Sequence, residues 1–285
     1  YVNYQYELYN FPGDESLSNT FTQRYGTYAD LENYRNIPFQ NWQDEVFGRE
    51  AFNQTHNLSV IGGSEVTTFS LTMNHVEEEG IMLNSGYKRD AANFKFDHKI
   101  NSKVKFGVNA RYSRRKIDGA GTSSTGSQGS NRLRNAVRYQ PFTGPGNENF
   151  VDEFDPQYAT LTNLTSPVLL ANNELQFDYR NDLILNSYLS YEIFKNLTFK
   201  SVIGYVQNDR KTNIFNGKVT SVARANADMP VVDLRNSQTR RVTNSNTLNY
   251  NWKINNLHRL DVLLGQETVR TDGESGRTYV KWLPS

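Results

Sequence analysis

The feature that most constrains the fold is an alternation of apolar and polar residues with a period of two. In KVKFGVNARYSRRK, residues 103–116, the even positions from Val104 to Tyr112 are apolar, and the odd positions from Lys105 to Ser113 are polar or glycine. Successive side chains of an extended strand point to opposite faces of a sheet. This stretch therefore predicts a β-strand with one apolar face and one polar face.

The same alternation returns along the chain in pairs of stretches that flank short turns. Paired glycines and asparagines at these turns permit the backbone conformations that tight hairpins need. The turns are GGSE at residues 62–65, Asn101 with Ser102, Lys195 with Asn196, and Asn255 with Asn256. The strands are predicted at residues 57–60, 67–76, 93–100, 103–116, 182–194, 197–205, 246–254 and 259–267. With YVNYQYELYN at residues 1–10, this rhythm predicts about nine antiparallel strands.

The opposite ends of these hairpins are joined by much longer connections. These are residues 11–55 and 117–175, with shorter ones near residues 77–86 and 216–235. Loops beyond about 12–15 residues are uncommon in compact soluble domains, whereas short turns at one rim and long loops at the other are typical of outer-membrane barrels. We therefore expect residues 1–285 to form one barrel wall, with extracellular loops at about 11–55 and 117–175.

The outward positions of the predicted strands give sets of apolar residues that no Lys, Arg, Asp or Glu interrupts. A Lys or Arg facing lipid costs about 2–4 kcal/mol at the midplane, so this face fits contact with outer-membrane lipid. Its residues are Phe69, Leu71, Met73, Phe94, Phe96, Val104, Phe106, Val108, Leu183, Leu185, Leu189, Ile193, Leu197, Phe199, Ile203, Leu248, Tyr250, Trp252, Leu260, Val262 and Leu264. The opposite face suits a wet lumen and carries Lys95, Asp97, Lys105, Arg111, Asp182, Glu192, Lys200, Lys253, Asp261 and Glu267.

A soluble β-sandwich is the alternative, because it also alternates apolar and polar residues. The predicted strand at residues 176–194 is longer than the usual ~5–6 residues of globular strands and exceeds the ~9–11 residues that cross a bilayer. Aromatic residues near strand ends also suit the girdles at a membrane surface. These residues are Tyr112, Tyr191, Tyr205, Tyr250 and Trp252. The pattern favours the membrane barrel.

Composition removes several other classes of protein. The 285 residues include no cysteine, which excludes disulfides, thiolate catalysis and Cys-based metal sites. The net charge of +1 gives no electrostatic reason to expect a nucleic-acid partner. The mean hydropathy is −0.70, and no apolar run approaches the ~18 residues of a spanning helix. A barrel can still have this composition, because it places its apolar residues at alternate positions.

Six segments of the chain together carry a resemblance to a known family. The first is NWQDEVF, and the longest is HNLSVIGGSEVTTFSLTMNHVEEEGIMLNSGYKR. The six are residues 41–47, 56–89, 96–114, 166–174, 187–205 and 258–267, which cover nearly the whole chain. They resemble successive barrel segments of the SusC/RagA-like TonB-dependent outer-membrane transporters, in the order in which that family has them.

The resemblance implies a plugged barrel of roughly 22 strands, with a TonB-contacting segment before the plug. About nine strands would leave an open wall, and unpaired strand edges are costly in hydrocarbon. We therefore expect the all-β chain to be a partial transmembrane barrel, an internal fragment of a longer protein in the outer membrane of a Gram-negative bacterium. The resemblance also implies active import of a glycan or oligopeptide, energised through TonB, with a SusD-like surface lipoprotein as partner.

Contacts with substrate or lipoprotein are expected in the long loops. DGAGTSSTGSQGSN, residues 118–131, is too poor in apolar residues to order itself. RLRNAVRYQPF, residues 132–142, predicts a short helix ended by Pro141. Aromatic side chains of the loops could stack on sugar rings or pack on a lid, and packing within the loop is the alternative for each. The candidates are Tyr139, Phe142, Phe150, Phe154, Tyr158 and Trp42.

Other candidate chemistry is weak. His56, His75, His98 and His258 stand far apart, so no metal site is expected. Glu77, Glu78 and Glu79 are adjacent and alternate between faces, which argues against a glycosidase carboxylate pair. Asp152, Glu153 and Asp155 lack the spacing of a calcium loop. Arg114, Arg115 and Lys116 mark the emergence of a strand into water.

No GxSxG, Walker or dinucleotide motif is present, so we expect no enzyme, catalytic residue or cofactor. Two alternatives to an active transporter stay open. One is a passive porin or adhesin barrel, and the other is a soluble carbohydrate-binding β domain.

Overall fold

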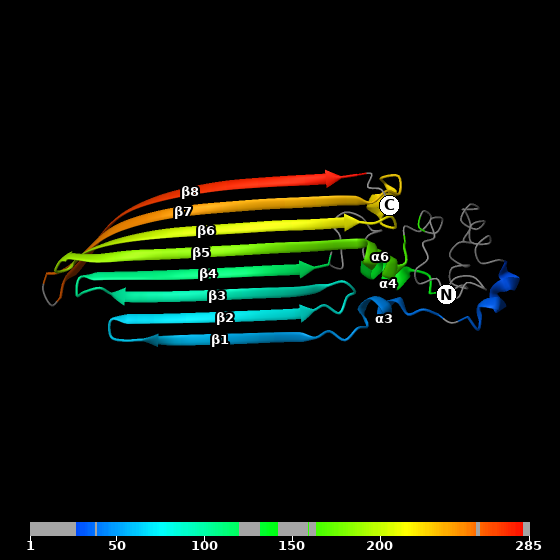
Figure 1. The fold of residues 1–285 in the computed structure, drawn as a ribbon, viewed down its shortest axis with the longest axis horizontal. Coiled ribbons are helices and arrows are strands. Elements are labelled where there is room, and N and C mark those ends of the chain that lie inside the picture. Colours follow the sequence, from blue (N-terminus) through cyan, green and yellow to red (C-terminus); the bar gives the residue numbers. More distant parts are fainter. Residues whose placement is uncertain are drawn as a thin grey trace.

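The computed structural model describes residues 27–37, 39–119, 132–141, 159, 164–254 and 257–281. They form one antiparallel sheet of eight strands, in which each strand pairs with its neighbours in sequence (Figure 1). The strands are β1 (Asn53–Gly63), β2 (Thr67–Glu79), β3 (Gly86–Lys99), β4 (Val104–Asp118), β5 (Glu174–Phe194), β6 (Leu197–Asn216), β7 (Val231–Lys253) and β8 (Arg259–Val280). Eight of the predicted strands are thus confirmed, and the stretch at residues 1–10 lies outside the described residues.

Short turns join the strands at one end of the sheet, which we call the turn end (Figure 1). Asn196, between β5 and β6, has a φ of +73°, in the left-handed region that asparagine tolerates. The Asn101 side chain accepts hydrogen bonds of 2.9 Å from the backbone N–H groups of Lys103 and Val104, which closes the turn between β3 and β4. Asn255 and Asn256 lie outside the described residues, but β7 and β8 pair on either side of them. The predicted hairpins are confirmed.

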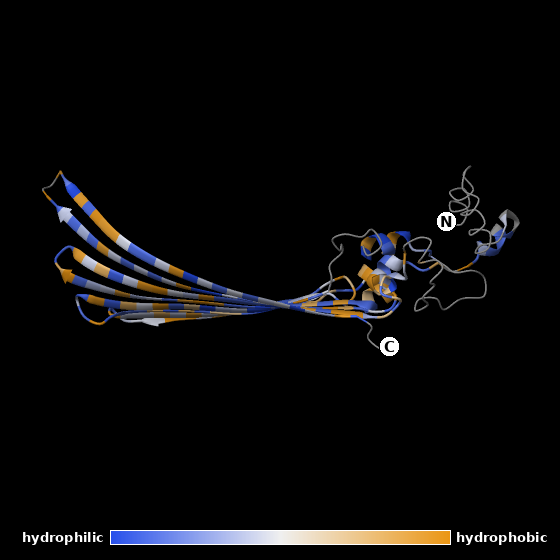
Figure 2. Ribbon diagram, turned by 90° about the horizontal axis from the view of Figure 1, so that it is seen from above, coloured by the Kyte–Doolittle hydropathy of each residue, from blue (hydrophilic) through white to orange (hydrophobic). Residues whose placement is uncertain are grey.

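The other end of the sheet, the loop end, carries the longer connections and every helix of the described residues (Figures 1 and 2). The helices α4 (Arg132–Arg138) and α6 (Pro167–Asn173) lie between β4 and β5, and α7 (Ser221–Arg224) lies between β6 and β7. The helices η1 (Tyr28–Tyr34) and α3 (Trp42–Phe47) precede β1. The short helix before Pro141 is confirmed. None of the helices in the described ranges has the length and apolar character needed to span a membrane.

The strands β6, β7 and β8 extend much further toward the loop end than the sequence pattern predicts, whereas β5 begins two residues before the predicted Gln176. β5 to β8 have 21, 20, 23 and 22 residues. In β8 the predicted strand stops at Glu267, whereas the observed strand continues to Val280. Polar residues occupy both faces of this extension, including Thr268 on one face and Thr271 on the other. Without an apolar face, the two-residue hydropathy signal disappears and only strand pairing reveals the strand.

The cross-strand register confirms the two predicted faces. Phe69 pairs with Phe96, and Phe96 pairs with Val108, so apolar residues of successive strands stand side by side on one face. The charged residues predicted for the lumen all fall on the other face, which we call the polar face. The bulge at residues 192–194 of β5 is a local irregularity in this register.

The apolar face is exposed. Ile203 is 53% exposed and Leu264 is 65% exposed. Figure 2 shows the sheet as one thin curved layer, with the helices gathered at the loop end. A soluble sandwich would bury such a face beneath a second sheet, and the described residues form no second sheet. The architecture is that of a partial β-barrel.

The uncharged part of the apolar face forms a belt of defined height. On β4 and β5 the belt spans the height of residues 104–112 and of their partners, residues 183–191, which is nine residues along each strand. This agrees with the ~9–11 tilted residues that cross a bilayer. Tyr112 and Tyr205 lie at its border toward the loop end, and Tyr191, Tyr250 and Trp252 lie at its border toward the turn end. The predicted girdle residues therefore bound the belt on both sides.

Candidate functional site

Arginine side chains gather on the polar face, from the loop-end border of the belt to the ends of the strands. Three aspartates on the same face, Asp178, Asp182 and Asp233, form ion pairs with some of them. The arginines are Arg89 (β3), Arg111 and Arg115 (β4), Arg180 (β5), Arg210 (β6), Arg235 and Arg241 (β7) and Arg277 (β8). This cationic surface is the candidate functional site.

Asp178 joins β5 to β6 beyond the belt. Its buried carboxylate accepts a hydrogen bond of 2.8 Å from Arg180, two residues along the same strand. It accepts two more from Arg210 on β6, at 3.1 Å from Nε and 2.7 Å from Nη2. Burial opposes ionisation of this group, but the bonds from the two arginines outweigh it and hold the pKa of Asp178 below its ordinary value.

Asp233 repeats this arrangement on β7 and β8. Arg235, two residues along β7, donates to it at 3.0 and 2.6 Å. Arg277 on β8 donates from Nε and Nη2, both at 2.9 Å. Burial again opposes ionisation, and the arginine bonds hold the pKa of Asp233 below its ordinary value. Each aspartate thus clamps two neighbouring strands at a height where no apolar belt stabilises them.

A buried ion pair anchors the long connection to the sheet. Arg132 at the start of α4 is 2% exposed and donates to the backbone carbonyl of Glu174, the first residue of β5. Its Nε also lies 3.4 Å from the Glu174 carboxylate. Burial lowers the pKa of Arg132 and raises that of Glu174, and their mutual attraction opposes both shifts. The short helical pattern gave no sign of this anchor, because Arg132 and Glu174 are 42 residues apart.

Two of the predicted aromatic contact residues, Trp42 and Tyr139, meet inside a cluster of helices. Their rings pack edge to face with centroids 5.4 Å apart, and Trp42 and Tyr139 are 3% and 5% exposed. The Trp42 indole donates to the backbone carbonyl of Gln140 at 2.8 Å. The cluster joins α3 to α4, and α6 contacts both. The other candidates, Phe142, Phe150, Phe154 and Tyr158, lie outside the described residues.

Replacing Trp42 by phenylalanine is expected to loosen this cluster. The ring contact with Tyr139 is largely kept, but the carbonyl of Gln140 loses a buried donor, which costs about 1–3 kcal/mol. Hydrogen exchange of α4 should become faster in the full-length variant, while exchange in β5 to β8 stays unchanged. Equal exchange in α4 of wild type and variant would show that the indole does not hold the helix.

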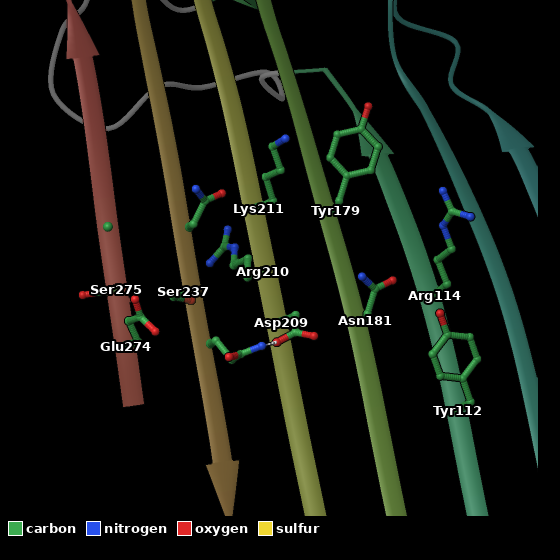
Figure 3. A pocket seen from close by; sticks show the side chains of 13 residues that line it. Tyr112, Arg114, Tyr179, Asn181, Asp209, Arg210, Lys211, Ser237, Glu274 and Ser275 are labelled. Carbon is green, nitrogen blue, oxygen red and sulfur yellow. Dashed lines mark hydrogen bonds between the residues drawn. The ribbon is translucent and has the colours of Figure 1, made fainter. Parts of the chain in front are cut away.

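A hollow lies on the opposite side of the sheet from the cationic surface. It is located beyond the belt, toward the loop end, where the face that is apolar in the belt becomes polar. It has a volume of about 700 Å³ and is lined by side chains of β4 to β8 (Figure 3). Asp209 accepts hydrogen bonds from Gln207 at 2.7 Å and from Gln238 at 2.6 Å. Arg114 and Lys211 are also part of its lining. The face that is uncharged within the belt is therefore polar and charged above it, as expected for a wall that leaves the membrane.

The prediction that the four histidines stand far apart is wrong for one pair. His56 and His75 lie directly opposite each other on β1 and β2, and their rings stack with centroids 6.1 Å apart. His75 Nδ1 also lies 2.7 Å from Asp90 Oδ1. Nineteen residues separate the two histidines in sequence, and the hairpin register brings them together. His98 lies 2.7 Å from the Thr67 hydroxyl.

The two runs of like charge are divided between the faces. Glu77 forms an ion pair with Lys88 on the same side as the belt, and Glu78 lies on the polar face. Arg115 pairs with Asp182 on the polar face, whereas Lys116 pairs with Asp118 at 2.8 Å on the other. Neither run is one patch. Asp152, Glu153 and Asp155 lie outside the described residues.

The chain is similar in sequence to curated TonB-dependent receptors of Formosa agariphila. It is 28% identical to TonB-dependent receptor P39 over 265 residues, which are 88% of this chain and 23% of that protein. It is 24% identical to TonB-dependent receptor P3 over 258 residues, 90% of this chain and 25% of that protein. The chain thus spans about a quarter of the length of these relatives. No family model matches it.

Solved structures with the same fold are those of a peptide transporter. The RagAB peptide importer in its open-open state superposes with a TM-score of 0.71 at 18% identity, over 100% of this chain and 33% of that one. A second structure of the RagAB peptide transporter gives a TM-score of 0.67 at 17% identity, over 97% and 32%. Sequence and fold together confirm the predicted resemblance: the chain is similar in sequence to TonB-dependent receptors, and it has the fold of a barrel segment of the RagAB transporter.

Proposed function

We propose that the complete protein imports a large nutrient, a glycan or an oligopeptide, across the outer membrane with energy supplied through TonB. The observation that carries this proposal is the similarity of nearly the whole chain to TonB-dependent receptors. The structural neighbours, which are described as a peptide importer, support an oligopeptide as one substrate class. A SusD-like lipoprotein at the cell surface is the proposed partner.

In this proposal the belt faces outer-membrane lipid, and the loop end faces the outside of the cell. Outer-membrane barrels have short turns on the periplasmic side and long loops on the extracellular side, and the chain has this asymmetry. The connections at about 11–55 and 117–175 would then meet the substrate and the lipoprotein. Trp42 and Tyr139 would position these loops from within the helical cluster, and the aromatic candidates from Phe142 to Tyr158 would make the contacts.

Uptake by the native bacterium tests the proposal. Fluorescent mixtures of oligopeptides and of oligosaccharides, each too large for ordinary porins, are supplied to wild-type cells, to cells lacking the full-length gene, and to cells depleted of TonB. We expect one mixture to accumulate in wild-type cells only. Uptake that needs the gene but persists without TonB would indicate a passive porin.

The soluble alternative is separated by fractionation of the same cells. A transporter barrel is expected in the outer-membrane fraction, as a polypeptide several times the 32.7 kDa of this chain. Peptides of this sequence recovered from a detergent-free soluble fraction, in a polypeptide near 32.7 kDa, would instead indicate a soluble binding domain.

A further inference from the structure

Four arginines stand in one row across four adjacent strands of the polar face. Arg89 pairs with Arg115, Arg115 pairs with Arg180, and Arg180 pairs with Arg210 in the register of β3 to β6. Like charges at directly opposite positions of a sheet destabilise it. A row of this kind therefore needs compensation by negative charge, and we call these four residues the arginine row.

Compensation from the described residues is incomplete. Asp178 binds Arg180 and Arg210, and Asp182 binds Arg115. Arg89 forms no ion pair with any described residue, and its Nε is buried without a hydrogen-bond partner there. The Nε atoms of Arg115 and Arg180 are also buried without a partner among these residues. The described residues therefore do not satisfy every guanidinium nitrogen of the row.

A hollow lies beside the row, toward the belt. Small side chains form part of its floor. Ala91 of β3 pairs with Ser113 of β4, and these two residues lie on the same face as Arg89 and Arg115, two positions closer to the belt. Arg111 lies on the far side of this floor, exposed and without an ion pair in the described parts of the chain. The hollow has a volume of about 580 Å³, and its polar lining includes Thr72, Asn74, Asn93 and Asn208 together with the Asp182 carboxylate, which is bonded to Arg115 and Asn208. Arg89 and Arg111 thus flank a shallow basin of hydrogen-bonding groups, and the one carboxylate among its lining residues, Asp182, is already bonded to Arg115.

The charge of this surface selects the chemistry of its ligand. Arg89, Arg111 and the rest of the arginine row supply five guanidinium groups, and Asp178 and Asp182 are the carboxylates bonded to them. Glu78, on the same face of β2, forms no ion pair with them. Guanidinium groups bind carboxylates and sulfates through paired hydrogen bonds. An anionic group bound beside these guanidinium groups would reduce the repulsion within the row.

We propose that this basin binds acidic groups of the imported oligomer, so that the transporter prefers substrates that carry carboxylates or sulfates over neutral ones of equal size. The inference rests on the proposed function, which places the row on the lumen side near the outer mouth of the barrel. Acidic oligopeptides and acidic oligosaccharides share this chemistry. The uncharged polar residues of the lining leave room for the remaining units of an oligopeptide or an oligosaccharide.

Binding to the purified full-length transporter, with its lipoprotein, tests the proposal. The probes are two matched pairs: a hexapeptide rich in Glu with its Gln counterpart, and a six-unit oligogalacturonide with its methyl ester. Isothermal titration should show at least one acidic member binding about tenfold or more tightly than its neutral partner, in line with the strength of charge-assisted bonds. The difference should shrink with added salt.

The double variant R89Q/R111Q should lose this preference, because the acidic member loses the affinity that the two guanidinium groups supply. R114Q is the matched control, because Arg114 neighbours Arg115 in sequence but lies on the opposite face of β4. The variant R89K/R111K keeps both charges and should keep part of the preference, which separates a charge effect from a folding defect. The inference would be overturned if the wild-type protein bound acidic and neutral probes with equal affinity. It would also be overturned if R89Q/R111Q and R114Q lost equal affinity for the acidic probe.

The uptake assay distinguishes this failure from failure of the proposed function. If cells take up oligomers in a TonB-dependent manner but the purified protein shows no preference for acidic oligomers, the proposed transport function stands and only the anion site is overturned. The arginine row would then face acidic side chains of the same polypeptide. Uptake independent of TonB would instead overturn the proposed function.

Discussion

Replacing Leu185 by arginine is expected to lower the free energy of unfolding of the full-length barrel by about 2–4 kcal/mol, the cost of a cation on the lipid side near the midplane. Leu185 lies within the belt, between Ala110 and Tyr205 of the neighbouring strands, and is 39% exposed. A guanidinium here would have to remain in hydrocarbon or deform the bilayer. Urea unfolding in lipid vesicles, followed by gel mobility of the folded form, measures the loss.

The neighbouring residue is the control for this prediction. Asn186 lies on the polar face, where its cross-strand neighbours Asn109 and Gly204 carry no charge. The Asn186→Arg variant adds the same side chain one residue away, but into the wet lumen, and should lose less than about 1 kcal/mol. Similar losses in the two variants would show that the two faces of β5 do not differ in their surroundings.

Replacing Asp233 by asparagine is expected to destabilise the loop end of the wall by about 2 kcal/mol. The side chain of Asp233 is 5% exposed, and its charge is shared by Arg235 and Arg277. Bonds to a charged group contribute about 1.5–3 kcal/mol each, and we discount them here because the arginine side chains are 53% and 56% exposed. Hydrogen exchange of β7 and β8 in the full-length protein should become faster.

Asp272→Asn is the matched control on the same strand pair. Asp272 pairs with Arg270 at 3.0 Å, but their side chains are 61% and 78% exposed, and exposed pairs contribute about 0–1 kcal/mol. We therefore expect little change in this variant. If both substitutions had equal effects, burial of Asp233 would contribute nothing to the clamp between β7 and β8.

The Asp233 clamp should also give the wall a dependence on acid. The pKa of Asp233 is lower in the folded protein than its ordinary value, because the bonds from Arg277 and Arg235 overcome the effect of burial. Its ionisation therefore stabilises the fold above the unfolded pKa, and this contribution is lost as the pH falls through the folded pKa. Asp233→Asn should flatten the dependence of β7–β8 exchange on pH in the acidic range. An unchanged dependence would assign the acid sensitivity to other groups.

The architecture of the sheet around the belt follows from local sequence patterns. Alternation of apolar and polar residues depends only on local geometry, so strands such as β4 and the face of each residue could be predicted without any contact. The turns were predictable for the same reason, since Asn101 and Asn196 act through their own backbone. Similar segments of known transporters then indicated the family.

The side chains that meet across strands could be identified only from the folded structure. Cross-strand register brings together the arginine row, the clamps at Asp178 and Asp233, and the stacked rings of His56 and His75. This register depends on the lengths of all the intervening turns and strands. The pairing of Trp42 with Tyr139 requires two loops to fold together. The loop-end halves of β6 and β8 were hidden because polar residues occupy both of their faces, so hydropathy carries no period there. A period of two identifies a strand and its faces, but the partners of a side chain depend on non-local hydrogen bonding.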